Sequence, residues 1–74
     1  MRKIENSSNI EFVDHDGKTL TVHFKGGKVY DYPDFPSDLH AKWMDHIDAG
    51  GSAGGWFHKH VKLSDYVGKK REAQ

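Results

Sequence analysis

TLTVHFKGGKVYDY, residues 19–32, predicts more of this chain's structure than any other stretch. Apolar and polar side chains alternate through its first part, so that Leu20, Val22 and Phe24 share one face of a strand. The glycine pair that follows is typical of a hairpin turn, and the β-branched and aromatic residues after it favour a second strand. We therefore expect an antiparallel hairpin with one apolar face.

The length of the glycine turn determines which way Tyr30 and Tyr32 point, because a slip of one residue moves every side chain of a strand to the opposite face. If residues 26–27 form a two-residue loop, Asp31 lies on the apolar face and both tyrosines point away from it. If residues 25–27 form a three-residue loop with a bulge, both tyrosines lie on the apolar face.

The three-residue loop is favoured, because an unpaired carboxylate on a core face is costly, whereas a tyrosine buries its ring and keeps its hydroxyl in water. We predict that the first tyrosine pairs with Val22 and the second with Leu20. Both rings should then lie beneath the first helix, so that only the hydroxyls and Phe35 reach a partner.

Another strand precedes this hairpin. In it we expect the even positions Ile10, Phe12 and Asp14 to face inward. Asp16-Gly17 is the strongest short-range signal for the turn between the two strands. Pro33, which has no backbone donor, should end the third strand.

Two helices are expected after the strands. Ser37 is predicted to cap the first, which should end at Gly50 and Gly51. Ser52 is predicted to cap a shorter helix over residues 53–61. The residues expected to be buried in these helices are Leu39, Trp43, Met44, Ile47, Trp56, Phe57 and Val61.

The sequence thus predicts an α+β fold, in which a three-stranded antiparallel meander is followed by two helices packed on one face, in the order β-β-β-α-α. We expect a single domain over residues 7–67, with last contacts from Leu63, Tyr66 and Val67. Residues 1–6 and 68–74 are expected to be disordered tails.

The composition argues against several classes of protein. The 74 residues include no cysteine, which rules out disulfides, thiolate catalysis and cysteine-based zinc sites. No apolar run approaches the roughly 20 residues of a membrane span, and the first residues lack the apolar core of a signal peptide. We expect a cytoplasmic protein with no membrane contact.

Acidic and basic residues balance at 11 each, which argues against binding nucleic acid by net charge alone. The charge is unevenly distributed along the chain. Residues 31–48 hold five aspartates and one lysine, a net charge of −4, and residues 56–71 hold five basic residues and one aspartate, a net charge of +4. Each segment offers a partner a surface of one sign.

Five motifs occur in a set order along the chain. They are SSNI at 7–10, LTVHF at 20–24 before a glycine turn, YDY at 30–32, Pro36 at the helix entry, and GSAGGWFHKHV at 51–61. In this order they resemble the KTSC domain, a small module named after the C-terminus of some lysyl-tRNA synthetases and also found as free-standing bacterial and phage proteins. His58 departs from the asparagine usual there. The resemblance implies the fold above, and the attachment to a synthetase suggests RNA binding.

An anion-facing surface is expected after the glycine stretch 51–55, where backbone amides precede a short basic helix. Nucleic acid would bind there and at the basic tail, with Trp56 or a tyrosine as a stacking platform. RNA or single-stranded nucleic acid is the leading partner, and the alternative is a protein partner in a phage or prophage setting. The candidate binding residues are Ser52, Trp56, His58, Lys59, His60, Lys62, Tyr30 and Tyr32.

No catalytic, metal or cofactor site is expected. The chain has six histidines, but His58 and His60 are about 200° apart on a helix and do not face one ion. The serines, histidines and aspartates match no known triad spacing. We therefore expect a binding module and not an enzyme.

Overall fold

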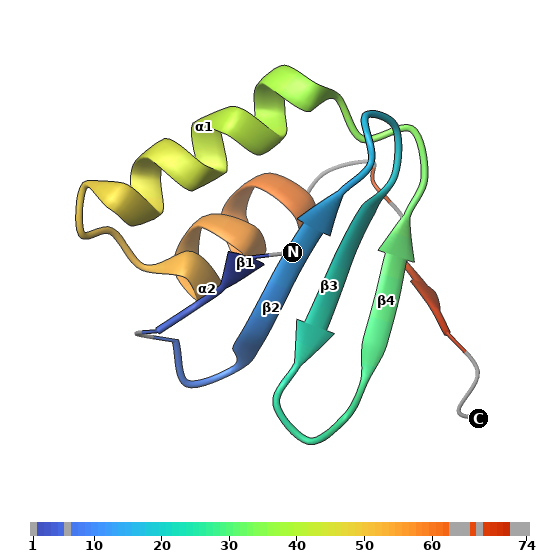
Figure 1. The fold of residues 1–74 in the computed structure, drawn as a ribbon, viewed down its shortest axis with the longest axis horizontal. Coiled ribbons are helices and arrows are strands. Elements are labelled where there is room, and N and C mark those ends of the chain that lie inside the picture. The colour runs from blue at the N-terminus through green and yellow to red at the C-terminus, as the bar shows by residue number, and fades with distance from the viewer. Residues whose placement is uncertain (1, 6, 63–65, 67, 72–74) are drawn as a thin grey trace.

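The computed structural model describes residues 2–5, 7–62, 66 and 68–71. The chain is an α+β domain with a five-stranded sheet in the order β1-β2-β3-β4-β5, in which all neighbours are antiparallel. Both α-helices cover the same face of the sheet, and no described helix covers the other face (Figure 1). The elements are β1 Arg2–Lys3, β2 Ile10–His15, β3 Leu20–Phe24, β4 Val29–Tyr32, α1 Ser37–Asp48, α2 Ala53–Phe57, a π-type turn His58–Lys62, and β5 Lys69–Lys70.

The predicted register of the β3–β4 hairpin is confirmed. Tyr30 pairs with Val22 and Tyr32 with Leu20, and the Phe24 amide donates to the Lys28 carbonyl at 2.7 Å across a three-residue loop. Both glycines of the loop have positive φ, 97° and 90°, a conformation that other residues rarely adopt. The tyrosines therefore lie on the helix-covered face of the sheet.

The prediction of a three-stranded sheet is wrong in its strand count. The β2–β3–β4 meander is present, but β1 pairs with β2 and β5 pairs with β4 at its two edges. Both added strands come from segments expected to be tails. Each satisfies backbone groups that the meander leaves unpaired, and the residue after β1, Ile4, is only 4 % exposed.

The expected inward direction of Phe12 and Asp14 is also wrong. The pairing of β2 with β3 shifts between Ile10 and Phe12, so one extra residue reverses the alternation. Val13 is buried instead, and Phe12 packs edge-on against His23 on the uncovered face, with ring centroids 6.0 Å apart.

Helix α1 presents the predicted apolar stripe to the sheet. Trp43 is fully buried and donates from its indole nitrogen to the Ala53 carbonyl at 3.2 Å, which joins α1 to α2. The predicted cap is corrected: Pro36 occupies the N-cap position, and the Ser37 hydroxyl instead donates to the Gly17 carbonyl at 3.2 Å. The helix ends at Asp48 with Ala49 as its C-cap, and Gly50, where φ is 90°, follows directly.

Helix α2 supplies the rest of the core. Ser52 caps it as predicted, because its hydroxyl accepts from the Gly55 amide at 3.0 Å, and the predicted burial of Trp56, Phe57 and Val61 is confirmed. Phe35, expected to reach a partner, is 1 % exposed. Its ring lies against Tyr66, with centroids 5.0 Å apart, whereas the contacts predicted for residues 63 and 67 lie outside the described residues.

Candidate functional site

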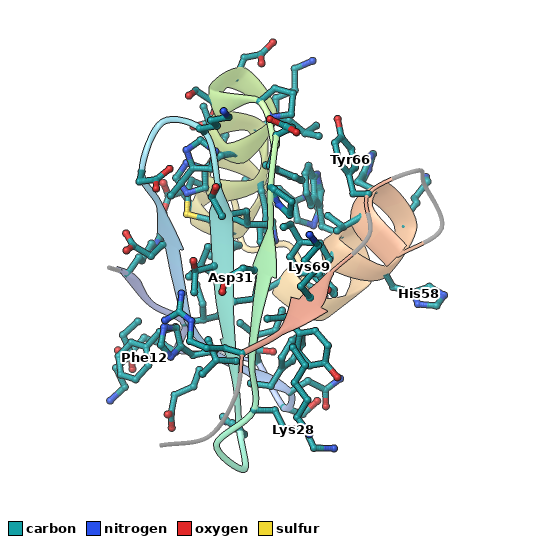
Figure 2. All side chains as sticks on the ribbon, turned by 90° about the vertical axis from the view of Figure 1, so that its right-hand side faces the viewer. Phe12, Lys28, Asp31, His58, Tyr66 and Lys69 are labelled. Atoms are coloured by element: carbon teal, nitrogen blue, oxygen red, sulfur yellow. The ribbon has the colours of Figure 1, made fainter. Side chains whose placement is uncertain are left out.

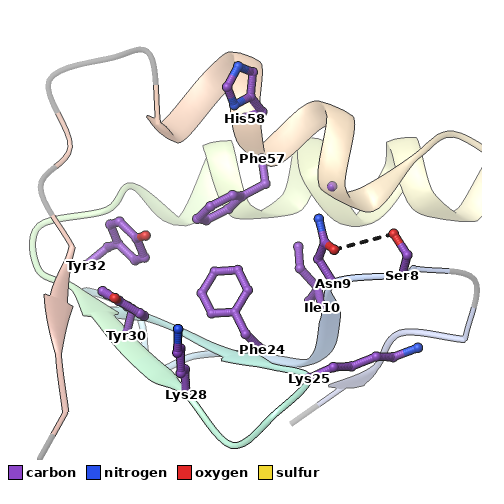
Figure 3. A pocket seen from close by; sticks show the side chains of 11 residues that line it. Ser8, Asn9, Ile10, Phe24, Lys25, Lys28, Tyr30, Tyr32, Phe57 and His58 are labelled. Carbon is purple, nitrogen blue, oxygen red and sulfur yellow. Dashed lines mark hydrogen bonds between the residues drawn. The ribbon is translucent and has the colours of Figure 1, made fainter.

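A pocket of about 460 Å³ opens between the end of the β3–β4 hairpin and helix α2 (Figure 3). Tyr30 and Tyr32 lie at one end of it and Asn9 lies at the other. The pocket exists because the glycine turn directs both tyrosines toward the helices, and α2 places Phe57 against the same face of the sheet. The remaining lining residues are Ser8, Ile10, Phe24, Lys25, Lys28, Gly54 and His58.

The walls of this pocket are mainly aromatic. Phe57 packs edge-on against Phe24 and against Tyr32, with ring centroids 5.6 Å apart in each case. Tyr30 meets Phe24 in the same way at 5.6 Å. Contacts of this kind hold the rings in place. Phe57 and Tyr32 are only 5 % and 7 % exposed, so the half-buried rings of Phe24 and Tyr30 offer the accessible surface for a flat or apolar group. The ring that covers Tyr32 comes from α2, which corrects the expectation that the first helix covers it.

Two lysines and a polar segment surround the aromatic walls. Lys25 and Lys28 are exposed at the hairpin turn, and the Lys25 amide donates to the Asn9 carbonyl at 2.7 Å. The Ser7 hydroxyl accepts from the amides of Asn9 and Ile10, which fixes this segment beside the turn. Among the described lining residues none is acidic. The mouth of the pocket therefore attracts anions and repels cations.

Tyr32 keeps its proton at neutral pH. Burial raises the pKa of its hydroxyl, and the neighbouring Tyr30 raises it further. The Tyr32 hydroxyl in the pocket is therefore neutral, and a neutral hydroxyl both donates and accepts hydrogen bonds.

The structure brings together three of the residues singled out in the sequence, Tyr30, Tyr32 and His58, of which His58 is exposed at the pocket rim. Trp56 is 8 % exposed and lies between Trp43 and His60, with ring centroids 5.4 Å and 4.4 Å away. Both faces of its ring are therefore covered, so it offers no stacking platform.

The other singled-out residues lie outside this pocket. Ser52 caps α2 and borders a second, polar pocket of about 490 Å³, near the ion pair between Arg2 and Asp48. Lys59 and His60 are exposed, and the side chain of Lys62 lies outside what the structure describes. Among the described residues, no group of three or more histidine, aspartate or glutamate side chains is arranged to hold a metal ion.

Sequence reasoning singled out three of the eleven residues that line the pocket and missed the other eight, among them Asn9, Phe24, Lys25 and Lys28. Asn9 and Phe24 stand inside two of the motifs that carry the resemblance, and these motifs meet around the pocket together with YDY and the α2 segment. The two lysines appeared in the sequence only as turn residues. Lys28 lies beside Tyr30 and Lys25 lies near Asn9 (Figure 3), and both positions depend on the hairpin register.

A family model described as the KTSC domain matches residues 6–66, which is most of the chain. No curated protein matches the chain. Over the residues described, no helix is both long and apolar enough to cross a membrane.

Proposed function

We propose that this chain, which belongs to the KTSC domain family, is a non-enzymatic binding module whose aromatic pocket takes one unpaired nucleotide of a single-stranded nucleic acid. The observation that carries the proposal is the combination of two half-buried aromatic rings, Phe24 and Tyr30, with two lysines in one pocket. Aromatic walls accept the flat face of any base, and lysines beside them neutralise the backbone phosphates.

The charge of the lining separates this ligand from other groups that bind aromatic walls. A methylated ammonium group also favours such rings, but Lys25 and Lys28 would repel it. A purely apolar group would leave Asn9 and the tyrosine hydroxyls without partners. A base with its phosphate meets both requirements.

A protein partner is the second candidate, because the chain has no net charge and nucleic-acid binders usually present a basic surface. The same pocket accommodates an aromatic side chain of a peptide that carries a carboxylate nearby. This alternative predicts binding to acidic peptides and none to oligonucleotides.

The test is an anisotropy titration with fluorescein-labelled octauridylate and octathymidylate. We expect dissociation constants below about 100 μM near 50 mM salt, weakening as salt rises. The double variant Lys25→Ala/Lys28→Ala should weaken binding by about tenfold or more, since two phosphate contacts are lost. The control Lys18→Ala/Lys42→Ala removes the same charge from exposed residues outside the pocket and should bind nearly as the unchanged protein does.

No salt-dependent binding of either oligonucleotide would contradict the proposal and leave the protein partner. Equal losses in the two double variants would mean that charge alone attracts the ligand, and the pocket would then have no part in it.

A further inference from the structure

Residues 68–71, here called the strap, run along the tyrosine end of the pocket. β5 pairs with β4 so that Lys70 lies opposite Tyr30 and Lys69 lies opposite Asp31. Residues directly opposite in an antiparallel pair point to the same face. Lys70 therefore points to the side of the pocket, and Lys69 points with Asp31 to the uncovered face. Figure 2 labels Lys69 and Asp31 on these two neighbouring strands.

Gly68 brings the strap onto the Tyr32 ring. A Cβ atom at this position would lie 2.5 Å from the Cε2 and Cζ atoms of Tyr32, closer than any side chain tolerates. Only glycine permits this approach, and the strap thereby covers part of a ring that lines the pocket.

Arg71 fixes the strap from the uncovered face of the sheet. Its Nε and Nη2 atoms donate to the two carboxylate oxygens of Asp31 at 3.0 and 2.6 Å, and its amide donates to the Val29 carbonyl at 2.7 Å. Thr21 donates to the same carboxylate at 2.7 Å. The Arg71 guanidinium holds the pKa of Asp31 below its ordinary value, so this pair stays charged at neutral pH.

We infer that the strap is part of the binding site, with Lys70 contacting a backbone phosphate of the bound strand and the Arg71–Asp31 pair positioning it. The inference rests on the proposed function, because it takes the ligand to be an anionic strand. Lys25 and Lys28 reach the ligand from the hairpin turn, and Lys70 reaches it from beside Tyr30. The strap lies beyond residues 6–66, which match the family model.

Lys69 and Lys70 form a matched pair for the test, since they carry the same charge on adjacent residues and face opposite sides of the sheet. Each is replaced by alanine and titrated with labelled octauridylate at several salt concentrations. Lys70→Ala should weaken binding about three- to tenfold and lower the slope of log affinity against log salt by about 0.7, the value for one phosphate of a single strand. Lys69→Ala should leave both quantities nearly unchanged.

Asp31→Asn tests the positioning role, because the expected change in affinity has the opposite sign to the change that net charge alone would cause. The substitution makes the protein more positive, so long-range attraction alone would tighten binding. Loss of the Arg71 contact should instead weaken binding toward the level of Lys70→Ala. The double variant Asp31→Asn/Lys70→Ala should bind no more weakly than Lys70→Ala alone. Thermal melts show whether the variant is folded, and Asp31→Ser, which also makes the protein more positive, replaces it if it is not.

Equal losses for Lys70→Ala and Lys69→Ala, or tighter binding by Asp31→Asn, would overturn the role of the strap and leave the proposed function in place. Failure of the unchanged protein to bind either octauridylate or octathymidylate would overturn both.

Discussion

His15 and His40 lie ring against ring between β2 and α1, with centroids 4.8 Å apart and planes 11° apart. The Gly17 amide donates to Nδ1 of His15, so Nε2 carries the proton and donates to the Phe35 carbonyl at 2.7 Å. Burial lowers the pKa of His40 and the neighbouring His15 lowers it further, against the opposite influence of Asp14. The pair thus joins the β2–β3 turn to the start of α1 in its neutral form.

The stability of the protein should therefore decrease in mild acid. The pKa of His40 in the folded chain lies below its ordinary value of 6.5. The contribution of neutral His40 to the free energy of unfolding is therefore complete above pH 6.5 and is lost as the pH falls below 6.5. Urea denaturation between about pH 7.5 and pH 5 measures the effect, with His40→Gln expected to flatten the profile. His58→Gln, at an exposed position, serves as the control. Equal profiles for His40→Gln and the unchanged protein would contradict this role of His40.

At the level of single elements, two glycines have opposite effects because their backbones differ. Gly27 closes the β3–β4 turn with φ at 90°, and an added Cβ atom would have no neighbour within 4 Å. The cost of alanine at this position is therefore the strain of the left-handed backbone alone. Gly54 lies inside α2, where the nearest atom to an added Cβ is Asn9 Nδ2 at 4.0 Å. A helix with alanine at this position loses less backbone entropy on folding.

Gly27→Ala should destabilise the protein by about 1–2 kcal/mol, and Gly54→Ala should stabilise it by about 0.5–1 kcal/mol. Urea denaturation of both variants gives the comparison. The chemical change is the same in each, so stabilisation by both would show that the turn does not require the left-handed conformation, and destabilisation by both would contradict the expectation for Gly54.

The strands also show where local patterns suffice. The β3–β4 register followed from the cost of placing Asp31 on the core face, a choice between two alternatives that differ by one residue. The register of β2 could not be predicted in this way, because nothing in the local sequence pattern indicates the shift between Ile10 and Phe12. A residue such as Phe12 looks like core until the pairing is known.

Across the whole molecule, stability should be concentrated in the central strands. Leu20 and Val22 on β3 are fully buried between paired neighbours, whereas β1 and β5 are two-residue strands at the edges. Hydrogen exchange measured by NMR should find the β3 amides among the slowest and the Arg71 amide much faster. Comparable protection of Arg71 and Val22 would mean that the strap is as stable as the core, contrary to this expectation.

Much of the architecture follows from local sequence signals: the meander, the apolar stripe of α1, the cap of α2 and the direction of Tyr30 and Tyr32. These depend on residues close together in the chain, whose periodicity and turn chemistry act without distant contacts. The edge strands and the pocket depend on long-range pairing instead. The pocket joins Asn9, the hairpin and α2, and β5 forms against the open edge of β4. Burial and sheet pairing stabilise these contacts between residues far apart in the chain, and local sequence patterns do not predict such contacts.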